Sequence, residues 1–116
     1  MSNAELNRLL EERSLVRQSF ENDQIAGYWA KAVTSVEDSR AKGISSDGAF
    51  QRAYTAALQA TLAVLAAHGL RVRATDNHFK TFYTLQHLGV TLRQYGLAFN
   101  GLRQTRHQSM YEPEHD

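Results

Sequence analysis

Apolar residues recur along this chain every three or four positions, the spacing that places them on one face of an α-helix. The clearest such face consists of Ile25, Tyr28, Trp29, Ala32, Val33 and Val36. A longer, alanine-rich segment carries a second face, made of Phe50, Tyr54, Ala57, Leu58, Thr61, Val64 and Leu65. No segment alternates apolar and polar residues for long enough to predict a strand. The pattern therefore predicts an all-α bundle, with Trp29 and its neighbours in the core.

Turn and capping residues divide these faces into separate helices. In the loop at 41–50, Gly43 ends one helix, and Ser46 or Asp47 is expected to cap the next. Gly69 follows the alanine-rich helix, where a left-handed C-terminal cap favours glycine. An N-terminal helix is expected from Leu6, Leu9, Leu10, Val16 and Phe20. Gly27, inside the first face, is interpreted as allowing the close approach of another helix.

Two more helices are predicted after Gly69. Thr75 or Asp76 is expected to cap the first of them, whose inward residues are Phe79, Phe82, Tyr83 and Leu88. The last helix begins at Thr91, and its apolar stripe consists of Leu92, Tyr95, Phe99 and Leu102. Asn100–Gly101 is a weak point at which this helix could kink or split.

The length of 116 residues suits one domain spanning 1–116, with 1–4 interpreted as flexible or tag-derived and 112–116 as an acidic tail. Cysteine is absent, which excludes disulfides and thiol catalysis. The apolar run at 62–67 is far shorter than a membrane span, and the polar start lacks a signal-peptide core. We therefore expect a cytoplasmic protein with no membrane association.

The charge is distributed unevenly. Residues 49–111 contain seven lysines and arginines against Asp76 alone, whereas 1–48 contain six against eight acidic residues. A basic second half could attract phosphate groups. The alternative is that these arginines are scattered over solvated helix faces.

The histidine spacing offers no ready metal site, because no two of the five lie three or four residues apart. His68 suits a helix C-terminus, and His78 and His87 are expected to begin and end one helix. There is neither a phosphate-binding glycine loop nor a nucleophile elbow. No metal and no cofactor is therefore expected.

The end of the last helix is the one stretch that combines several groups suited to phosphate chemistry. Arg103, Arg106, His107 and Tyr111 are related by steps of three and four, so they share one broad helical face. Arginine binds a phosphodiester with two parallel hydrogen bonds, histidine can move a ribose 2′-hydroxyl proton, and tyrosine can stack on a base.

Arg106 lies on the apolar stripe of that helix, a position where a solvated charge is unexpected. Either the stripe opens there onto a cleft or a subunit boundary, or Arg106 pairs with an acid such as Glu37 or Asp38.

The segment "SDGAFQRAYTAALQATLAVLAAHGLRVRATDNHFKTFYTL", followed by "LRQTRHQSMYEP", resembles the HEPN domain family, in particular its small stand-alone branch. The resemblance extends from about residue 23 to the end of the last helix and includes "IAGYWAKAVTSVEDSRAKGIS". It implies an up-and-down bundle of four to five helices and a homodimer joined along the last helices. Many relatives are metal-independent ribonuclease toxins paired with a nucleotidyltransferase-like antitoxin; others bind nucleotides or RNA without cleaving them.

The family's ribonuclease motif places a histidine after an arginine and four to six intervening residues. Here Arg103 and His107 are separated by only three residues, and Arg106 has no histidine at that distance. The favoured hypothesis is therefore a module that binds RNA, a nucleotide or a protein partner through Arg103, Arg106, His107 and Tyr111. The alternative is a ribonuclease in which the two arginines hold the phosphate and His107 takes the 2′-hydroxyl proton.

Overall fold

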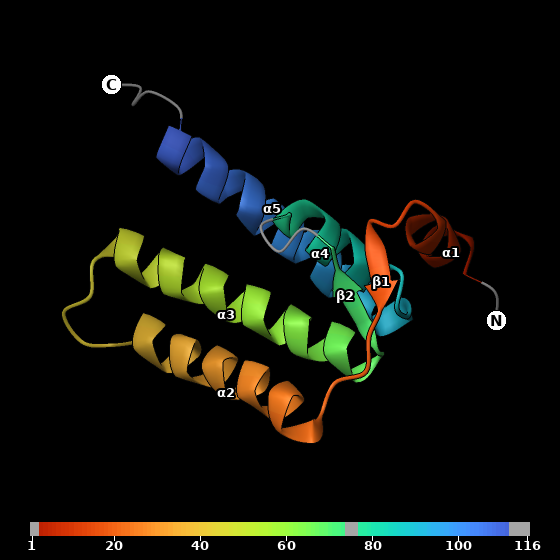
Figure 1. The fold of residues 1–116 in the computed structure, drawn as a ribbon. Coiled ribbons are helices and arrows are strands. Elements are labelled where there is room, and N and C mark those ends of the chain that lie inside the picture. The colour runs from red at the N-terminus through yellow and green to blue at the C-terminus, as the bar shows by residue number, and fades with distance from the viewer. Residues whose placement is uncertain (1–2, 74–76, 112–116) are drawn as a thin grey trace.

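The computed structural model describes residues 3–73 and 77–111, with the side chains of 109–111 excepted. The described chain forms α1 (Ala4–Glu11), β1 (Leu15–Arg17), α2 (Asn22–Ser39), α3 (Ser46–Ala67), β2 (Leu70–Val72), α4 (His78–Gln86) and α5 (Val90–Tyr111). Figure 1 shows α2 and α3 as an antiparallel pair, with α5 and α4 above α3 and α1 at the far end. The predicted mainly helical fold is confirmed.

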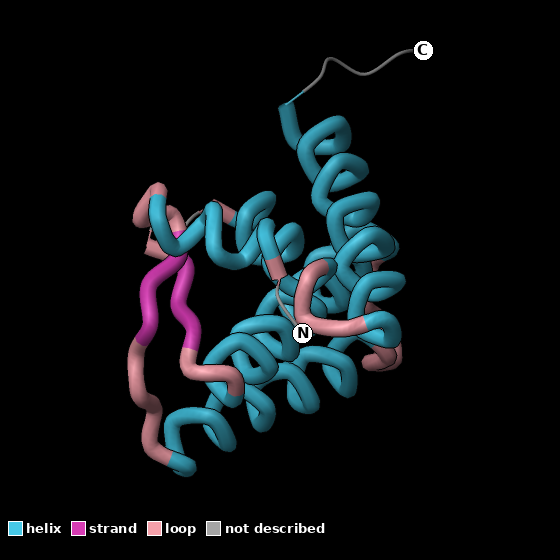
Figure 2. The backbone as a smooth tube through the Cα atoms, turned by 90° about the vertical axis from the view of Figure 1, so that its right-hand side faces the viewer, coloured by secondary structure: helices cyan, strands magenta, loops and turns pink. Residues whose placement is uncertain are grey.

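The prediction that the chain has no strand is wrong. β1 and β2 form an antiparallel pair in which Leu15 faces Val72 and Arg17 faces Leu70. Figure 2 shows this pair at the edge of the helical body. Each strand has only three residues, too few to show an alternating pattern in the sequence. Leu15, Leu70 and Val72 are buried, so the pair is held by the core.

The first helix is shorter than its apolar spacing predicts, because α1 ends at Glu11 and Val16 belongs to β1. The N–H of Ser14 donates to the carbonyl of Leu9, and the N–H of Arg13 donates to that of Leu10, each at 3.1 Å. These two bonds are the Schellman arrangement that closes a helix.

The cap of α3 is Ser45, one residue before the predicted Ser46 or Asp47, and its Oγ accepts from the N–H of Gly48 at 2.9 Å. Gly69 has φ 69°, which confirms the predicted left-handed residue after α3.

The cap of α4 is Asn77, whose Oδ1 accepts from the N–H of Lys80 at 3.0 Å. The predicted caps Thr75 and Asp76 lie outside the described residues. His78 and His87 begin and end this helix as expected. α5 begins at Val90 and is continuous to Tyr111, so it is not split at Asn100–Gly101.

The main core lies where the strand pair meets α1, α3 and α4. Its buried members are Leu9, Leu15, Leu65, Leu70, Val72 and Leu85. Phe82 of α4 is completely buried.

The first apolar face, on α2, is not part of this core, because Trp29 is 55% exposed and Val33 43% exposed. The prediction that Trp29 belongs to the core is therefore wrong: α2 packs through its small residues Ala32 and Ser35, which are buried.

A glycine does allow two helices to pack closely, but this glycine is Gly96 on α5 and not Gly27 on α2. A Cβ at Gly96 would lie 2.7 Å from the carbonyl oxygen of Phe82 and 2.8 Å from the backbone nitrogen of Gln86. A Cβ at Gly27 would meet nothing within 4 Å, so the interpretation that Gly27 allows the close approach of another helix is wrong.

In the described part of the chain, no helix is long and apolar enough to cross a membrane.

Candidate functional site

A cleft of about 400 Å³ opens between α3, α4 and α5 near the C-terminal half of α5. It is lined by Tyr54, Asn77, His78, Phe79, Arg103, Arg106 and His107. The structure thus brings together three residues of the predicted site, Arg103, Arg106 and His107. The side chain of the fourth, Tyr111, lies outside the described residues.

Arg106 is held in the cleft by an amide and an aromatic ring. Its Nε donates to Oε1 of Gln51 at 3.1 Å, and its guanidinium carbon lies 5.1 Å from the ring centre of Tyr54. Among the described residues, neither Glu37 nor Asp38 forms an ion pair with Arg106. The alternative in which Arg106 pairs with one of these two acids is therefore not found in the described structure.

Arg103 lies one turn earlier and is held in the same manner. Its Nε donates to Oδ1 of Asn100 at 3.1 Å, and its guanidinium carbon is 5.4 Å from the ring centre of Phe79. In both arginines, these contacts engage Nε and the flat face of the guanidinium. Within the described chain, the terminal Nη groups of Arg103 and Arg106 have no hydrogen-bond partner. These terminal Nη groups can bind an oxyanion in a bidentate arrangement, with two parallel hydrogen bonds.

Tyr54 forms the floor of the cleft and is only 3% exposed. Its hydroxyl shares a 2.7 Å hydrogen bond with Nδ1 of His78, with a direction set by the histidine tautomer. Burial raises the pKa of Tyr54, while the nearby guanidiniums of Arg106 and Arg103 act in the opposite direction. The phenol is therefore un-ionised at neutral pH, and it fixes the position of the His78 ring.

Phe79 provides an aromatic surface at the cleft and is 45% exposed, although the spacing predicts that it points inward. Its other support is Tyr83, whose ring stacks on it with centres 5.6 Å apart. A half-exposed ring beside two arginines is the arrangement on which nucleic-acid bases stack.

Two histidines line the cleft from different helices. His107 is exposed on α5, and His78 is half-buried at the start of α4. Imidazole is the side chain best suited to proton transfer near neutral pH. Sequence reasoning missed His78 and Tyr54 as site residues, because only the packing of α3 against α4 and α5 brings them to Arg106. In the described chain, no three acidic or histidine side chains are grouped to hold a metal ion.

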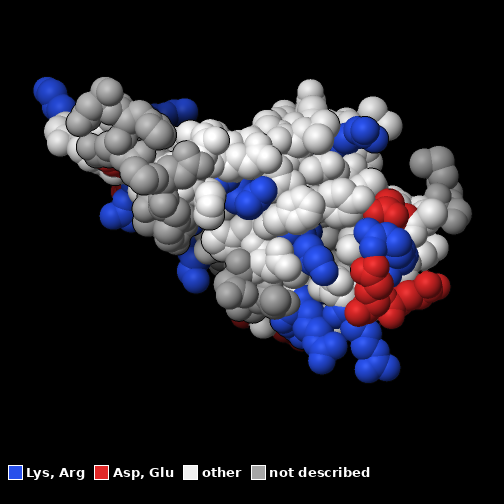
Figure 3. All heavy atoms as spheres, turned by 90° about the horizontal axis from the view of Figure 1, so that it is seen from above, with Lys and Arg blue, Asp and Glu red and all other residues white. Residues whose placement is uncertain are grey.

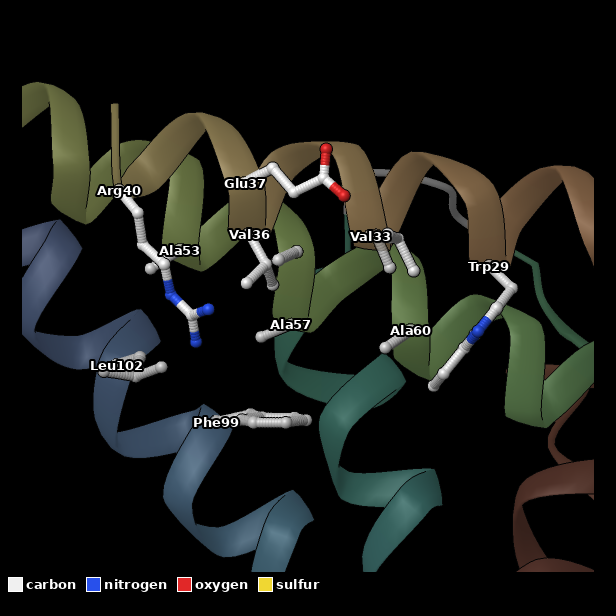
Figure 4. Close-up of a pocket in the computed structure, with 12 residues that line it drawn as sticks. Trp29, Val33, Val36, Glu37, Arg40, Ala53, Ala57, Ala60, Phe99 and Leu102 are labelled. Carbon is white, nitrogen blue, oxygen red and sulfur yellow. The ribbon is translucent and has the colours of Figure 1, made fainter. Parts of the chain in front are cut away.

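A second hollow, the apolar groove, lies between α2, α3 and α5 and has a volume of about 490 Å³. Figure 4 shows Trp29, Val33 and Val36 on α2 facing Phe99 and Leu102 on α5, with alanines of α3 forming the floor. Arg40 extends over the groove, and Glu37 lies one turn earlier on α2. The exposed part of the first apolar face is therefore one wall of this groove.

No protein-family model matches this chain, and neither a curated protein nor a solved structure is significantly similar to it. The chemistry of the cleft therefore comes from its own residues. Two guanidiniums can hold a phosphodiester, an exposed ring can stack on a base, and two imidazoles can accept or donate protons.

Proposed function

We propose that this protein binds single-stranded RNA through the cleft between α3, α4 and α5. The observation that carries the proposal is the pair Arg103 and Arg106. Their Nε atoms donate to Asn100 and Gln51, and their guanidinium faces lie against two aromatic rings. Their terminal Nη groups have no hydrogen-bond partner among the described residues. Two arginines at a cleft, neither neutralised by a described carboxylate, suit the phosphate backbone.

The aromatic side of the cleft favours a single strand over a duplex. Phe79 presents a half-exposed ring next to Arg103, and unpaired bases can stack on such a ring. A base inside a duplex is covered by its neighbours and cannot reach that surface. A mononucleotide could make the same contacts with Phe79 and the arginines, but it would offer them fewer phosphates than a strand of RNA.

The resemblance to HEPN domains agrees with this proposal, since members of that family bind RNA or nucleotides. On that basis we propose that the protein is part of a toxin–antitoxin or defence system with a nucleotidyltransferase-like protein partner. We propose separately that it acts in the cytoplasm. The Arg103-to-His107 spacing, which is shorter than in the cleaving relatives, favours binding over cleavage.

The test is a fluorescence-anisotropy titration of a labelled single-stranded RNA of about eight nucleotides. Arg106→Ala removes a charge-assisted phosphate contact and should weaken binding by about 1.5–3 kcal/mol. Arg93→Ala is the matched control, because Arg93 is exposed on the same helix and does not line the cleft. Equal affinities for wild type and Arg106→Ala, or no binding by wild type, would overturn the proposal.

A second candidate function is RNA cleavage, and the observation that favours it is the presence of both His78 and His107 at the cleft. One imidazole would take the 2′-hydroxyl proton as that oxygen attacks the phosphorus. The other would protonate the departing 5′-oxygen, leaving a 2′,3′-cyclic phosphate. Incubation of RNA with wild type and with His107→Ala, followed by gel analysis of the products, tests it. Intact RNA with the wild-type protein would exclude this candidate.

We propose in addition that the protein is a homodimer joined across the apolar groove, so that α2 and α3 contribute as well as the predicted last helix. The exposed Trp29, Val33 and Val36 would be covered by the second copy. Contacts are reciprocal in a two-fold dimer, so Glu37 of each copy can face Arg40 of the other. Arg40 has no carboxylate partner among the residues that the structure describes.

Light scattering after size exclusion tests the dimer. Wild type at micromolar concentration should have twice the 13.1 kDa chain mass. Glu37→Arg should give monomers by placing like charges together, and the charge exchange E37R/R40E should restore the dimer. Val90→Glu is a control, because Val90 is 92% exposed and lies outside the groove. A wild-type mass of one chain, or no rescue by the exchange, would contradict the proposal.

A further inference from the structure

A second cationic pocket adjoins the cleft at the start of α4. It has a volume of about 410 Å³, and its charged lining consists of Arg13, Arg73, Lys80 and Glu12. Asn77 lines both this pocket and the cleft, so the two hollows share a wall. The cleft lies on the His78 and Phe79 side of this first turn of α4, and the second pocket lies on the Lys80 side.

The described lining of the pocket carries a net positive charge. Its one described carboxylate, Glu12, already forms an ion pair with Arg8 on α1. Neither Arg13, Arg73 nor Lys80 forms an ion pair within the described chain. Lys80 donates through Nζ to Oγ of Ser14 at 2.7 Å, which positions the ammonium at the pocket while leaving further protons to donate.

Arg13 occupies a backbone position that normally belongs to glycine. Its φ is 64°, and no other described non-glycine residue has a positive φ. Arg13 is the left-handed residue of the turn that ends α1. Glycine adopts this conformation without the clash that a Cβ causes. The residue at this left-handed position, unlike a glycine, adds a third cationic side chain beside Arg73 and Lys80 at the pocket.

The two pockets meet at Asn77. Figure 3 shows lysines and arginines across the middle of the face seen from above, with acidic side chains gathered mainly toward one end. A polynucleotide presents its phosphates at regular intervals, so two adjoining cationic pockets suit successive phosphates of one strand. A mononucleotide would fill only the cleft.

We infer that the pocket of Arg13, Arg73 and Lys80 binds further phosphates of the strand whose first contacts are in the cleft, which makes the ligand a single-stranded polynucleotide several residues long. This inference rests on the proposed function. It adds a ligand length and a direction, from Arg103 and Arg106 past Asn77 toward the end of α1.

The experiment compares fluorescein-labelled oligouridylates of two and of about eight nucleotides, bound to wild type and to the double variant R13G/R73A. Glycine suits the positive φ at position 13, and the backbone N–H of Arg73, which donates to the carbonyl of Ser14, is kept in alanine. Arg17→Ala is the matched control, since Arg17 is exposed on β1 and does not line the pocket. Arg73→Ala alone is the fallback if the double variant melts early.

We expect R13G/R73A to bind the longer strand on the order of tenfold or more weakly than wild type, with unchanged affinity for the dinucleotide. The dependence of log affinity on log salt for the longer strand should fall by about 0.7 for each lost phosphate contact. Equal weakening for both lengths, or an effect no larger than that of Arg17→Ala, would overturn the inference. The proposed function fails separately, if Arg106→Ala leaves binding of both lengths unchanged.

Discussion

Arg106 shows how a charged residue occupies an apolar stripe without an acidic partner among the described residues. Its guanidinium lies against the ring of Tyr54 and donates to the neutral amide of Gln51. An aromatic face attracts a cation, and an amide oxygen satisfies one N–H without neutralising the charge. The positive charge therefore remains available to a ligand, which a pairing with Glu37 or Asp38 would have prevented.

The stability of the Arg106→Ala variant distinguishes an Arg106 held by neutral groups from an Arg106 held by an ion pair. The variant loses one hydrogen bond to a neutral amide and one cation–ring contact, so unfolding in urea should show a decrease of about 1–2 kcal/mol. Breaking a buried ion pair would instead decrease stability by about 3–5 kcal/mol. Arg93→Ala again serves as the control on an exposed part of α5. A decrease in the larger range would show that Arg106 has an acidic partner and that its role is structural.

Part of the site is readable from the sequence because it lies on one helix. Arg103, Arg106 and His107 share a face at steps of three and four, and the structure places all three at the cleft. Tyr54 and His78 come from two other helices, and their 2.7 Å contact depends on how those helices pack. No spacing along the chain contains that information.

The contact between α4 and α5 is the element contact on which the cleft depends most. Gly96 lets α5 approach the backbone of α4 at Phe82 and Gln86, and the same two helices present Phe79 and Arg103 to each other. Any change that separates the helices would therefore open the cleft as well as weaken the fold.

Gly96→Ala should decrease stability by about 1–3 kcal/mol, because its Cβ would overlap backbone atoms that cannot move aside. Gly27→Ala is the matched control: it adds the same methyl group to an open position of α2 and should stabilise by about 0.5–1 kcal/mol. Thermal melting of the two variants measures both effects. A stable Gly96→Ala protein would contradict the close packing of α4 on α5.

α1 is attached to α4 through Glu5. The hydroxyl of Tyr83 donates to Oε2 of Glu5 at 2.5 Å, and Arg8 forms an ion pair with the same carboxylate. Hydrogen bonds from Arg8 and Tyr83 lower the pKa of Glu5 from 4.5 to about 2. Since Tyr83 also stacks on Phe79, this attachment supports one wall of the cleft.

The lowered pKa of Glu5 predicts an acid-sensitive contribution to stability. A carboxylate with a lower pKa in the folded state stabilises the fold above about pH 4.5, and the contribution is lost as the pH falls toward 2. The melting-temperature difference between wild type and Glu5→Gln should therefore shrink over that range. Glu11→Gln is the control on the same helix. A difference independent of pH would contradict the role given to the Glu5 carboxylate.

The arrangement of the elements could be predicted only in part. The long helices follow from their apolar spacing and caps, and the left-handed Gly69 follows from the end of α3. The strand pair could not be predicted, because three-residue strands have no period and their pairing joins segments more than fifty residues apart. The exposure of Trp29 was missed because the apolar face of α2 is wider than the contact that α3 offers.

Considered as one body, the protein separates two surfaces by means of α5. Arg103 and Arg106 line the cleft, whereas Phe99 and Leu102 of the same helix line the apolar groove. A second copy in the groove would therefore leave the cleft open, so RNA binding and dimerisation are compatible. Affinity for RNA per subunit should be similar in the dimer and in the monomeric variant Glu37→Arg.

Chemical-shift mapping by NMR tests RNA binding at the cleft most directly, because it shows where a ligand lies without altering a residue. A single-stranded RNA of about eight nucleotides is titrated into the ¹⁵N-labelled protein. We expect the largest changes at the amides of Asn77, Phe79, Arg103 and Arg106 and at the Nε–H signals of the two arginines. Changes confined to the apolar groove around Trp29, or a spectrum unaffected by RNA, would contradict the account.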